Sequence, residues 1–160
     1  DHLDGFGGTK PVRIGNAAGY EMASELQELA RTFAAESGGS FLMTNDPVEA
    51  VTGADFIYTD CWWWTGQEDE YKDRVAAFQA FQVNPDLWSH AKPEAKFMHC
   101  LPAMRGEEVV DEIADGPMSI IFPQAQNRMH FQKGLMLALV GIDALPDDPE
   151  LQEIGRALLS

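Results

Sequence analysis

The segment from His99 to Glu108 carries the side chains of this chain that are best suited to chemistry. It brings an imidazole, a thiol, a Leu-Pro bond and a guanidinium together directly after an apolar run. A proline after a buried strand ends the strand's hydrogen bonding and fixes a turn. A turn at Leu101-Pro102 would point the carbonyls of Cys100 and Leu101 into a cleft, as acceptors for an amine or amide. An ordinary strand end, and a trans or cis bond before Pro102, stay open at this point.

A second candidate, Asp60, ends the apolar run FIYT and precedes three tryptophans. A carboxylate there suits a substrate ammonium group, and apolar neighbours would strengthen that charge interaction relative to water. A loop or N-cap aspartate is the competing interpretation. Among the tryptophans, Trp62 suits the core, whereas an exposed tryptophan would form the wall of a substrate pocket.

The third candidate, Arg128, opens a strongly apolar helix together with Asn127. A guanidinium at that place can donate hydrogen bonds to an anionic or carbonyl oxygen; a surface pairing with one of the many acids is the alternative. A metal site formed by Cys61, His99 and Cys100 is disfavoured, because the adjacent His-Cys pair lacks the C-x-x-C spacing of common zinc sites.

The elements that must position these side chains alternate along the chain. Short apolar runs bounded by turn residues predict strands, and amphipathic or charged stretches between them predict helices. We expect strands at residues 12–14, 40–44, 56–59, 95–99 and 119–122. We expect helices from Leu26 to the glycines at 38–39, at 47–51, 67–81, 107–114 and 124–140, and a short one in the C-terminal tail.

This alternation predicts an α/β fold, with a parallel sheet and helices on both faces. Ligands of such sheets bind at the carboxyl ends of the strands. Asp60 and the His99–Leu101 turn both follow strand ends, so we expect them on one rim of the sheet.

Composition bounds the class of protein. The chain has 160 residues, 45% of them hydrophobic, which suits one globular domain with a core. Its 26 acidic and 11 basic side chains give a formal charge of −15, which disfavours nucleic acid and anionic membranes as partners. No apolar run reaches the roughly 18 residues that span a bilayer. Two cysteines at strand ends suit reduced thiols, and we expect a cytoplasmic location.

The combined motifs resemble a known family. HCLPAMRGEEV, followed by DGPMSIIFPQAQNRMHFQKGLM, is similar to the second half of ornithine carbamoyltransferases, and the similarity runs in order from about Gly19 to about Val140. It implies that residues 19–140 form a Rossmann-like domain that binds the amino-acid substrate. Residues 1–18 would then be a loop and the first remaining strand, and 141–160 an acidic tail with a short helix.

Enzymes of this family transfer a carbamoyl group from carbamoyl phosphate to an amine, which gives citrulline when the amine is ornithine. By position, the resemblance implies that Asp60 holds the ornithine ammonium. Cys100 and the Leu101 carbonyl would contact the reacting amine and the carbamoyl amide. Arg128 would contact carbamoyl phosphate, and His99 would support the turn. The resemblance further implies no metal or organic cofactor, and a homotrimer for the parent protein.

The chain departs from the family's pattern in two ways. The Ser-x-Arg-Thr-Arg phosphate loop and the domain's opening strand do not occur in it, so we expect the C-terminal part of a longer enzyme, inactive alone. After Asp60, Trp64 and Thr65 replace the serine and methionine that contact ornithine, and both are substrate-binding candidates. Putrescine carbamoyltransferases also carry an aromatic there, which leaves putrescine or another amine as an alternative acceptor. A truncated, non-catalytic paralogue is the alternative of another class.

Overall fold

The computed structural model describes residues 10–140 together with Pro149 and Glu153. The expected loop at residues 1–9 and most of the tail after residue 140 lie outside this range. Contacts divide the chain into two units, Asp1–Ser119 and Ile120–Ser160. The division predicted from the sequence, with boundaries after residues 18 and 140, stays a prediction.

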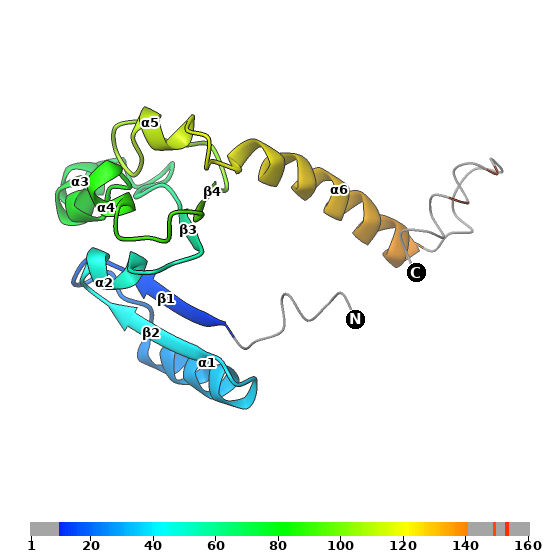
Figure 1. Ribbon diagram of the computed structural model, residues 1–160, viewed down its shortest axis with the longest axis horizontal. Coiled ribbons are helices and arrows are strands. Elements are labelled where there is room, and N and C mark those ends of the chain that lie inside the picture. The colour runs from blue at the N-terminus through cyan, green and yellow to red at the C-terminus, as the bar shows by residue number, and fades with distance from the viewer. Residues whose placement is uncertain (1–9, 141–148, 150–152, 154–160) are drawn as a thin grey trace. The chain divides into compact units, whose positions relative to one another are not determined.

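The strands of the first unit form two parallel ladders (Figure 1). β1 (Pro11–Gly15) pairs with β2 (Ser40–Thr44), and β3 (Phe56–Thr59) pairs with β4 (Lys96–His99). The predicted α/β class with parallel strands is therefore confirmed, and the expected bounds of the strands at 40–44 and 56–59 match the structure.

The single sheet expected from the sequence is seen, among the described residues, as two separate two-stranded ladders. Doubly wound sheets place their first strand in the middle, with the second and third strands on one side and the fourth and fifth on the other. The orders β2-β1 and β3-β4 reproduce the two sides. Among the described residues, no strand pairs with the second edge of β1 or of β3.

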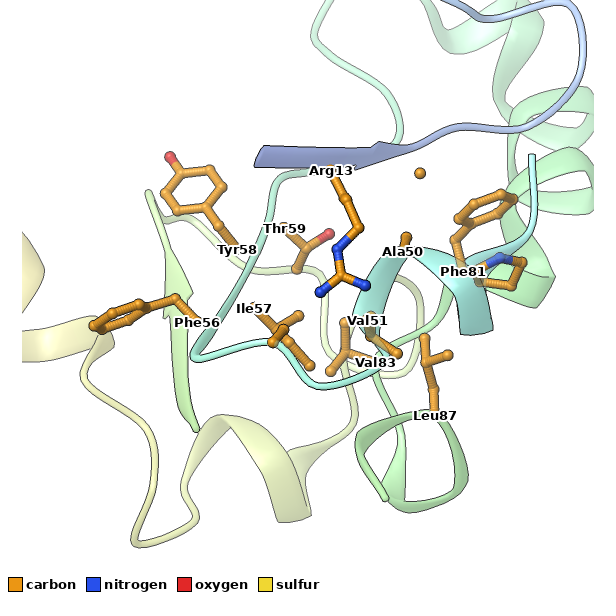
Figure 2. Close-up of a pocket in the computed structure, with 13 residues that line it drawn as sticks. Arg13, Ala50, Val51, Phe56, Ile57, Tyr58, Thr59, Phe81, Val83 and Leu87 are labelled. Carbon is orange, nitrogen blue, oxygen red and sulfur yellow. The ribbon is translucent and has the colours of Figure 1, made fainter. Parts of the chain in front are cut away.

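Both of these unpaired edges border the same space (Figure 2). All four residues of β3 line a cavity of about 120 Å³ with Arg13 and Gly15 of β1. Cavities of about 210 Å³, beside Lys10, and about 360 Å³, beside Asn16, continue it towards the two ends of the strands. We call this space between β1 and β3 the central gap. Phe56 and Tyr58, which alternate on one face of β3, are both more than half exposed.

Local signals account for the first two helices. α1 (Ser24–Glu36) lies alongside β2 and is followed by Gly38, whose φ of 74° suits a residue without a side chain. α2 (Pro47–Val51) begins with proline in its first turn, where a missing N–H costs nothing. The carboxylate of Asp46 caps α2 by accepting hydrogen bonds from two of its backbone N–H groups.

The middle of the first unit contains short helices. The charged segment predicted at 67–81 forms α3 (Tyr71–Phe78), flanked by the 3₁₀ turns η1 (Glu68–Glu70) and η2 (Gln79–Phe81). α4 (Pro85–Trp88) was not predicted, although Asn84 supplies a cap for it by accepting a hydrogen bond from the Leu87 N–H.

The helix predicted at 107–114 is shorter than expected. α5 (Asp111–Ala114) begins four residues late because the preceding chain forms a closed turn instead. In this turn the Gly106 N–H donates to the carbonyl of Val109, and the Glu107 N–H donates to the carbonyl of Met104. These bonds engage backbone groups that a helix from 107 would need.

The strand predicted at 119–122 was wrong. Ser119 makes only an isolated parallel bridge to Phe97, and α6 (Ile121–Val140) begins two residues later. The apolar run SIIF cannot be assigned by periodicity, since it suits a buried strand or a helix start equally. Pro123 favours the helix, because proline is tolerated in a first helical turn. No helix among the described residues is long and apolar enough to cross a membrane.

The core of the first unit lies around β4. Phe97 is fully buried and packs edge-on against Trp88, and Ala95 and Val109 are also fully buried. His99, the last residue of β4, is fully buried as well, so the strand carries the following turn on a rigid support.

Candidate active site at the ends of β3 and β4

The carboxyl ends of β3 and β4 lie together. Thr59 pairs in register with His99, so Asp60 and Cys100 leave the ladder side by side. The Cys100 thiol donates to Asp60 Oδ1 at 3.0 Å, and the same oxygen accepts from the Cys61 N–H at 2.7 Å. The expectation that Asp60 and the Cys100 turn share a rim is confirmed, while their roles stay predictions.

The turn after β4 has an uncommon backbone. The Leu101-Pro102 bond is cis, and Leu101 has a φ of 60°, a left-handed value that is unusual for a bulky residue. The Leu101 N–H donates to Nδ1 of His99 at 2.8 Å. No hydrogen bond among the described residues ends at the Leu101 carbonyl, so this oxygen can accept one from a substrate.

Two thiols lie at this corner, and both are held protonated. Burial raises the pKa of Cys61 to about 11, with help from the charges of Glu108 and Asp60. Burial also raises the pKa of Cys100, and its hydrogen bond to Asp60 acts in the same direction. The Cys61 thiol donates to the carbonyl of Pro102 at 3.0 Å. Both thiols therefore act as hydrogen-bond donors at neutral pH.

Slow alkylation of both cysteines is the expected consequence. The thiolate is the reactive form, and a thiol with a pKa near 11 is ionised about a hundredfold less at pH 8 than a free cysteine with a pKa of about 8.5. Iodoacetamide should therefore modify Cys61 about two orders of magnitude more slowly than it modifies free cysteine, with rates rising as pH rises. Peptide mapping by mass spectrometry measures each site.

The denatured chain is the control for thiol alkylation, and it should react at the rate of free cysteine. Asp60→Asn should speed the alkylation of Cys100, because it removes a charge that raises the pKa of that thiol. Rapid alkylation of both native thiols would contradict the hydrogen-bonded arrangement.

A possible metal cluster at this corner is already engaged in other bonds. Ligand atoms of Asp60, Cys61 and His99 lie within 4.8 Å of one another. Nδ1 of His99, however, accepts from Leu101, and Nε2 faces the carboxylate of Glu108 at 3.1 Å. An ion would have to displace one of these bonds, so the corner fits a hydrogen-bonded network better than a metal site.

The three tryptophans after Asp60 lie in three different environments. Trp62 is buried and stacks on Phe78, as expected for the core. The indole N–H of Trp63 donates to Glu107 at 3.0 Å. Trp64 is 50% exposed and lines the cavity of about 360 Å³ that also contacts Asp60. Thr65 is exposed and does not line that cavity, so the structure brings Trp64 to the site and leaves Thr65 beside it.

The same cavity contains residues that sequence reasoning missed. Arg74 lines it, with its guanidinium 5.2 Å from the ring centre of Tyr20, another lining residue. Arg74 also donates to Glu70 at 2.8 Å and to the carbonyl of Trp62 at 3.4 Å. The segment around it is charged and helical, which is typical of a solvated face, so no local signal marked it.

Arg128, the predicted carbamoyl phosphate contact, lies on α6 in the second unit. Its side chain is exposed, and no hydrogen bond or ion pair joins it to another described residue. Gln126, two residues earlier, is exposed too. The role of Arg128 stays a prediction.

Comparison with known proteins finds one family along most of the chain. The family model described as Aspartate/ornithine carbamoyltransferase, Asp/Orn binding domain, matches residues 6–139. Ornithine carbamoyltransferase of Bacillus subtilis is 50% identical over 129 residues, which cover 81% of this chain and 40% of that protein. The anabolic enzyme of Pyrococcus furiosus is 50% identical over 130 residues, 81% of this chain and 41% of that protein.

Solved structures agree with this result. Ornithine carbamoyltransferase from Pyrococcus furiosus superimposes with a TM-score of 0.75 at 50% identity, over 80% of this chain and 41% of that one. The anabolic enzyme from Campylobacter jejuni also gives a TM-score of 0.75, at 32% identity, over 81% of this chain and 43% of that one. The chain thus spans about 40% of the length of these relatives.

Proposed function

Because the chain belongs to the aspartate/ornithine carbamoyltransferase family, we propose that it supplies the amine-binding half of a carbamoyltransferase that converts ornithine and carbamoyl phosphate to citrulline and phosphate. The observation that carries the proposal is the 3.0 Å contact of Asp60 and Cys100, which joins an anion and a thiol donor beside a cavity. The two free cysteines suit the reducing cytoplasm, where we place the enzyme.

The charge of Asp60 decides which amine it holds. A carboxylate stabilises the charged form of a nearby amine and so raises its pKa. An amine must instead lose its proton, from an ordinary pKa of about 10.4, before it can attack a carbonyl carbon. Asp60 therefore holds the ornithine ammonium that does not react. Among the described residues both hydrogen bonds to the Asp60 carboxylate end at Oδ1, which leaves Oδ2 for this ammonium.

The backbone turn at Leu101 serves the reacting group. Its carbonyl and the Cys100 thiol contact the attacking amine and the carbamoyl amide, and His99 supports the turn. Holding the amine against the carbonyl carbon supplies much of the rate advantage through proximity. Arg128 contacts the phosphate oxygens, where a bidentate guanidinium stabilises the negative charge. Residues 19–140 form the amino-acid-binding domain in this scheme.

Two cavity residues bear on the acceptor. Arg74 bonds to Glu70 through Nε and to the Trp62 carbonyl through Nη1, which leaves Nη2 for a substrate carboxylate, a group that ornithine has and putrescine lacks. Trp64, at the place where ornithine enzymes carry serine, instead offers an apolar wall that suits the carbon chain of putrescine. We assign ornithine as the acceptor, because Arg74 gives that substrate an interaction that putrescine cannot make; putrescine is the second candidate.

Acceptor preference is measured in a chimera in which this chain replaces the matching part of the Pyrococcus furiosus enzyme. We expect citrulline formation from ornithine to exceed carbamoylputrescine formation in kcat/KM by at least about tenfold, the scale of one charged hydrogen bond. Arg74→Met should lower kcat/KM for ornithine by a similar factor and leave that for putrescine unchanged. If the chimera prefers putrescine, putrescine becomes the assigned acceptor. If Arg74→Met lowers kcat/KM equally for both amines, Arg74 does not bind the substrate carboxylate.

The central gap supports the proposal that further polypeptide completes this site. Among the described residues, β1 and β3 each have one unpaired edge beside the same cavity, which fits one extended strand between them. The relatives' additional length provides room for such a strand and for a phosphate-binding domain. For the whole protein we propose a homotrimer, as the resemblance implies.

A further inference from the structure

A fully buried carboxylate, Glu108, contacts the candidate site without lining its cavity. Its Oε1 accepts from Nε2 of His99 at 3.1 Å and from the Met104 N–H at 2.6 Å, while Oε2 has no partner among the described residues. Both Glu108 and His99 are 0% exposed. Burying a carboxylate is unfavourable, and apolar side chains often fill such space with greater stability. A role other than stability would explain the acid at this position.

The hydrogen bonds of His99 define its protonation. Nδ1 accepts the Leu101 N–H at 2.8 Å, so Nδ1 carries no proton. Nε2 then carries the proton and donates it to Glu108. Oε1 of Glu108 also accepts the Met104 N–H, so it meets Nε2 as an acceptor and selects this tautomer, as the partner of one imidazole nitrogen generally decides the state of the other.

Leu101 depends on this tautomer. Its φ of 60° is sterically disfavoured for a leucine and has to be held by its surroundings. The hydrogen bond to Nδ1 of His99 is the side-chain contact that holds its N–H. In the other tautomer two N–H donors would face each other, and the Leu101 backbone would be released. The direction of the Leu101 carbonyl would then be lost.

We propose that Glu108 is a positioning residue, which fixes the His99 tautomer and through it the backbone of Leu101. The last step, from the Leu101 carbonyl to the reacting amine, rests on the proposed function. Glu107, the adjacent acid, binds elsewhere: it accepts from the Trp63 indole and from the Tyr71 hydroxyl, both at 3.0 Å. The two consecutive carboxylates therefore hold different parts of the site.

Kinetics of the chimera test the proposal. Glu108→Leu should lower kcat with ornithine by about a hundredfold, the loss that a misplacement of about 1 Å can cause, with a change in KM below about threefold. Glu108→Gln keeps an oxygen acceptor for Nε2 and should retain kcat within about fivefold of the parent chimera. Glu112→Gln removes an exposed acid nearby and should change neither constant. Equal kcat in the leucine and glutamine variants would overturn the proposal.

Nuclear magnetic resonance of ¹⁵N-labelled histidines reads the tautomer directly, in the 160-residue chain and in the chimera. His99, assigned with a His99→Gln variant, should be the neutral Nε2–H form in the parent and in Glu108→Gln, and a mixture in Glu108→Leu. An Nδ1–H form in the parent overturns the proposal even if Glu108→Leu fails to fold. If the chimera shows no turnover, the proposed function is refuted. The ¹⁵N spectra would still report the His99 tautomer, so failure of the proposed function and failure of the Glu108 proposal are distinguishable.

Discussion

Alone, the 160-residue chain is expected to form no citrulline from ornithine and carbamoyl phosphate. Carbamoyl phosphate is an anion, and a chain with a formal charge of −15 repels it unless cations surround the phosphate. Few of the described arginines have a guanidinium available to bind a phosphate. Arg31, Arg74 and Arg105 are each paired with carboxylates, and Arg13 donates to the carbonyl of Glu49. Arg128 and Lys133 are exposed cations on α6.

An incomplete sheet adds a second reason for inactivity. The rim that carries Asp60 and Cys100 ends a ladder whose other edge borders the central gap. An unpaired edge leaves backbone groups and apolar side chains in water, which lowers the local stability of the strands beside it. Site geometry within a few tenths of an ångström requires rigid supports, and in the described part of the chain β3 pairs with β4 alone.

A sensitive citrulline assay compares the isolated chain with the chimera at equal concentration. Turnover should be absent from the chain and present in the chimera, which supplies the phosphate site and the remaining part of the relative's chain. The chimera carrying Arg128→Ala is the matched control, and it should retain its fold while losing most activity. Citrulline made by the chain alone would refute the expectation. An inactive, well-folded chimera would favour the non-catalytic paralogue.

Replacing Asp60 with asparagine is expected to lower kcat/KM for ornithine by about a hundredfold. Asparagine preserves the shape of the side chain and an oxygen that accepts the Cys61 N–H, so the corner should keep its structure. It removes the charge that holds the non-reacting ammonium. A hydrogen bond to a charged group in a partly buried site contributes up to about 3 kcal/mol, which is a factor of about a hundred.

Most of the Asp60→Asn effect should lie in KM, because the lost interaction exists in the bound substrate as well as in the transition state. Asp69→Asn is the matched control, since it removes one negative charge from an exposed site on the same segment. That variant should behave like the parent chimera. If Asp60→Asn and Asp69→Asn had the same small effect, Asp60 would be a loop residue, as the competing interpretation of its position holds.

Sequence patterns located the strands and turns where their signals are local. The strands at 40–44 and 56–59 lie between turn residues, and the Asn-Asp-Pro sequence at 45–47 marks the start of α2. The patterns failed where two local preferences compete. SIIF has no decisive period, so a helix start was mistaken for a strand. At 104–109 a closed turn uses backbone groups that the expected helix required.

The sequence by itself determined the α/β class, the family, and the placement of Asp60 and Cys100 after strands that end on one rim. The class and the placement follow from short-range patterns, because parallel pairing turns two separate strand ends into neighbours, whereas the family follows from the resemblance of the combined motifs. Only the tertiary structure decided that a thiol of residue 100 meets a carboxylate of residue 60 at 3.0 Å, and that Arg74 lines the cavity beside them. It likewise decided the buried pairing of His99 with Glu108. Such contacts depend on the path of the turns and on how side chains pack in the core. A short window of neighbouring residues encodes neither of these.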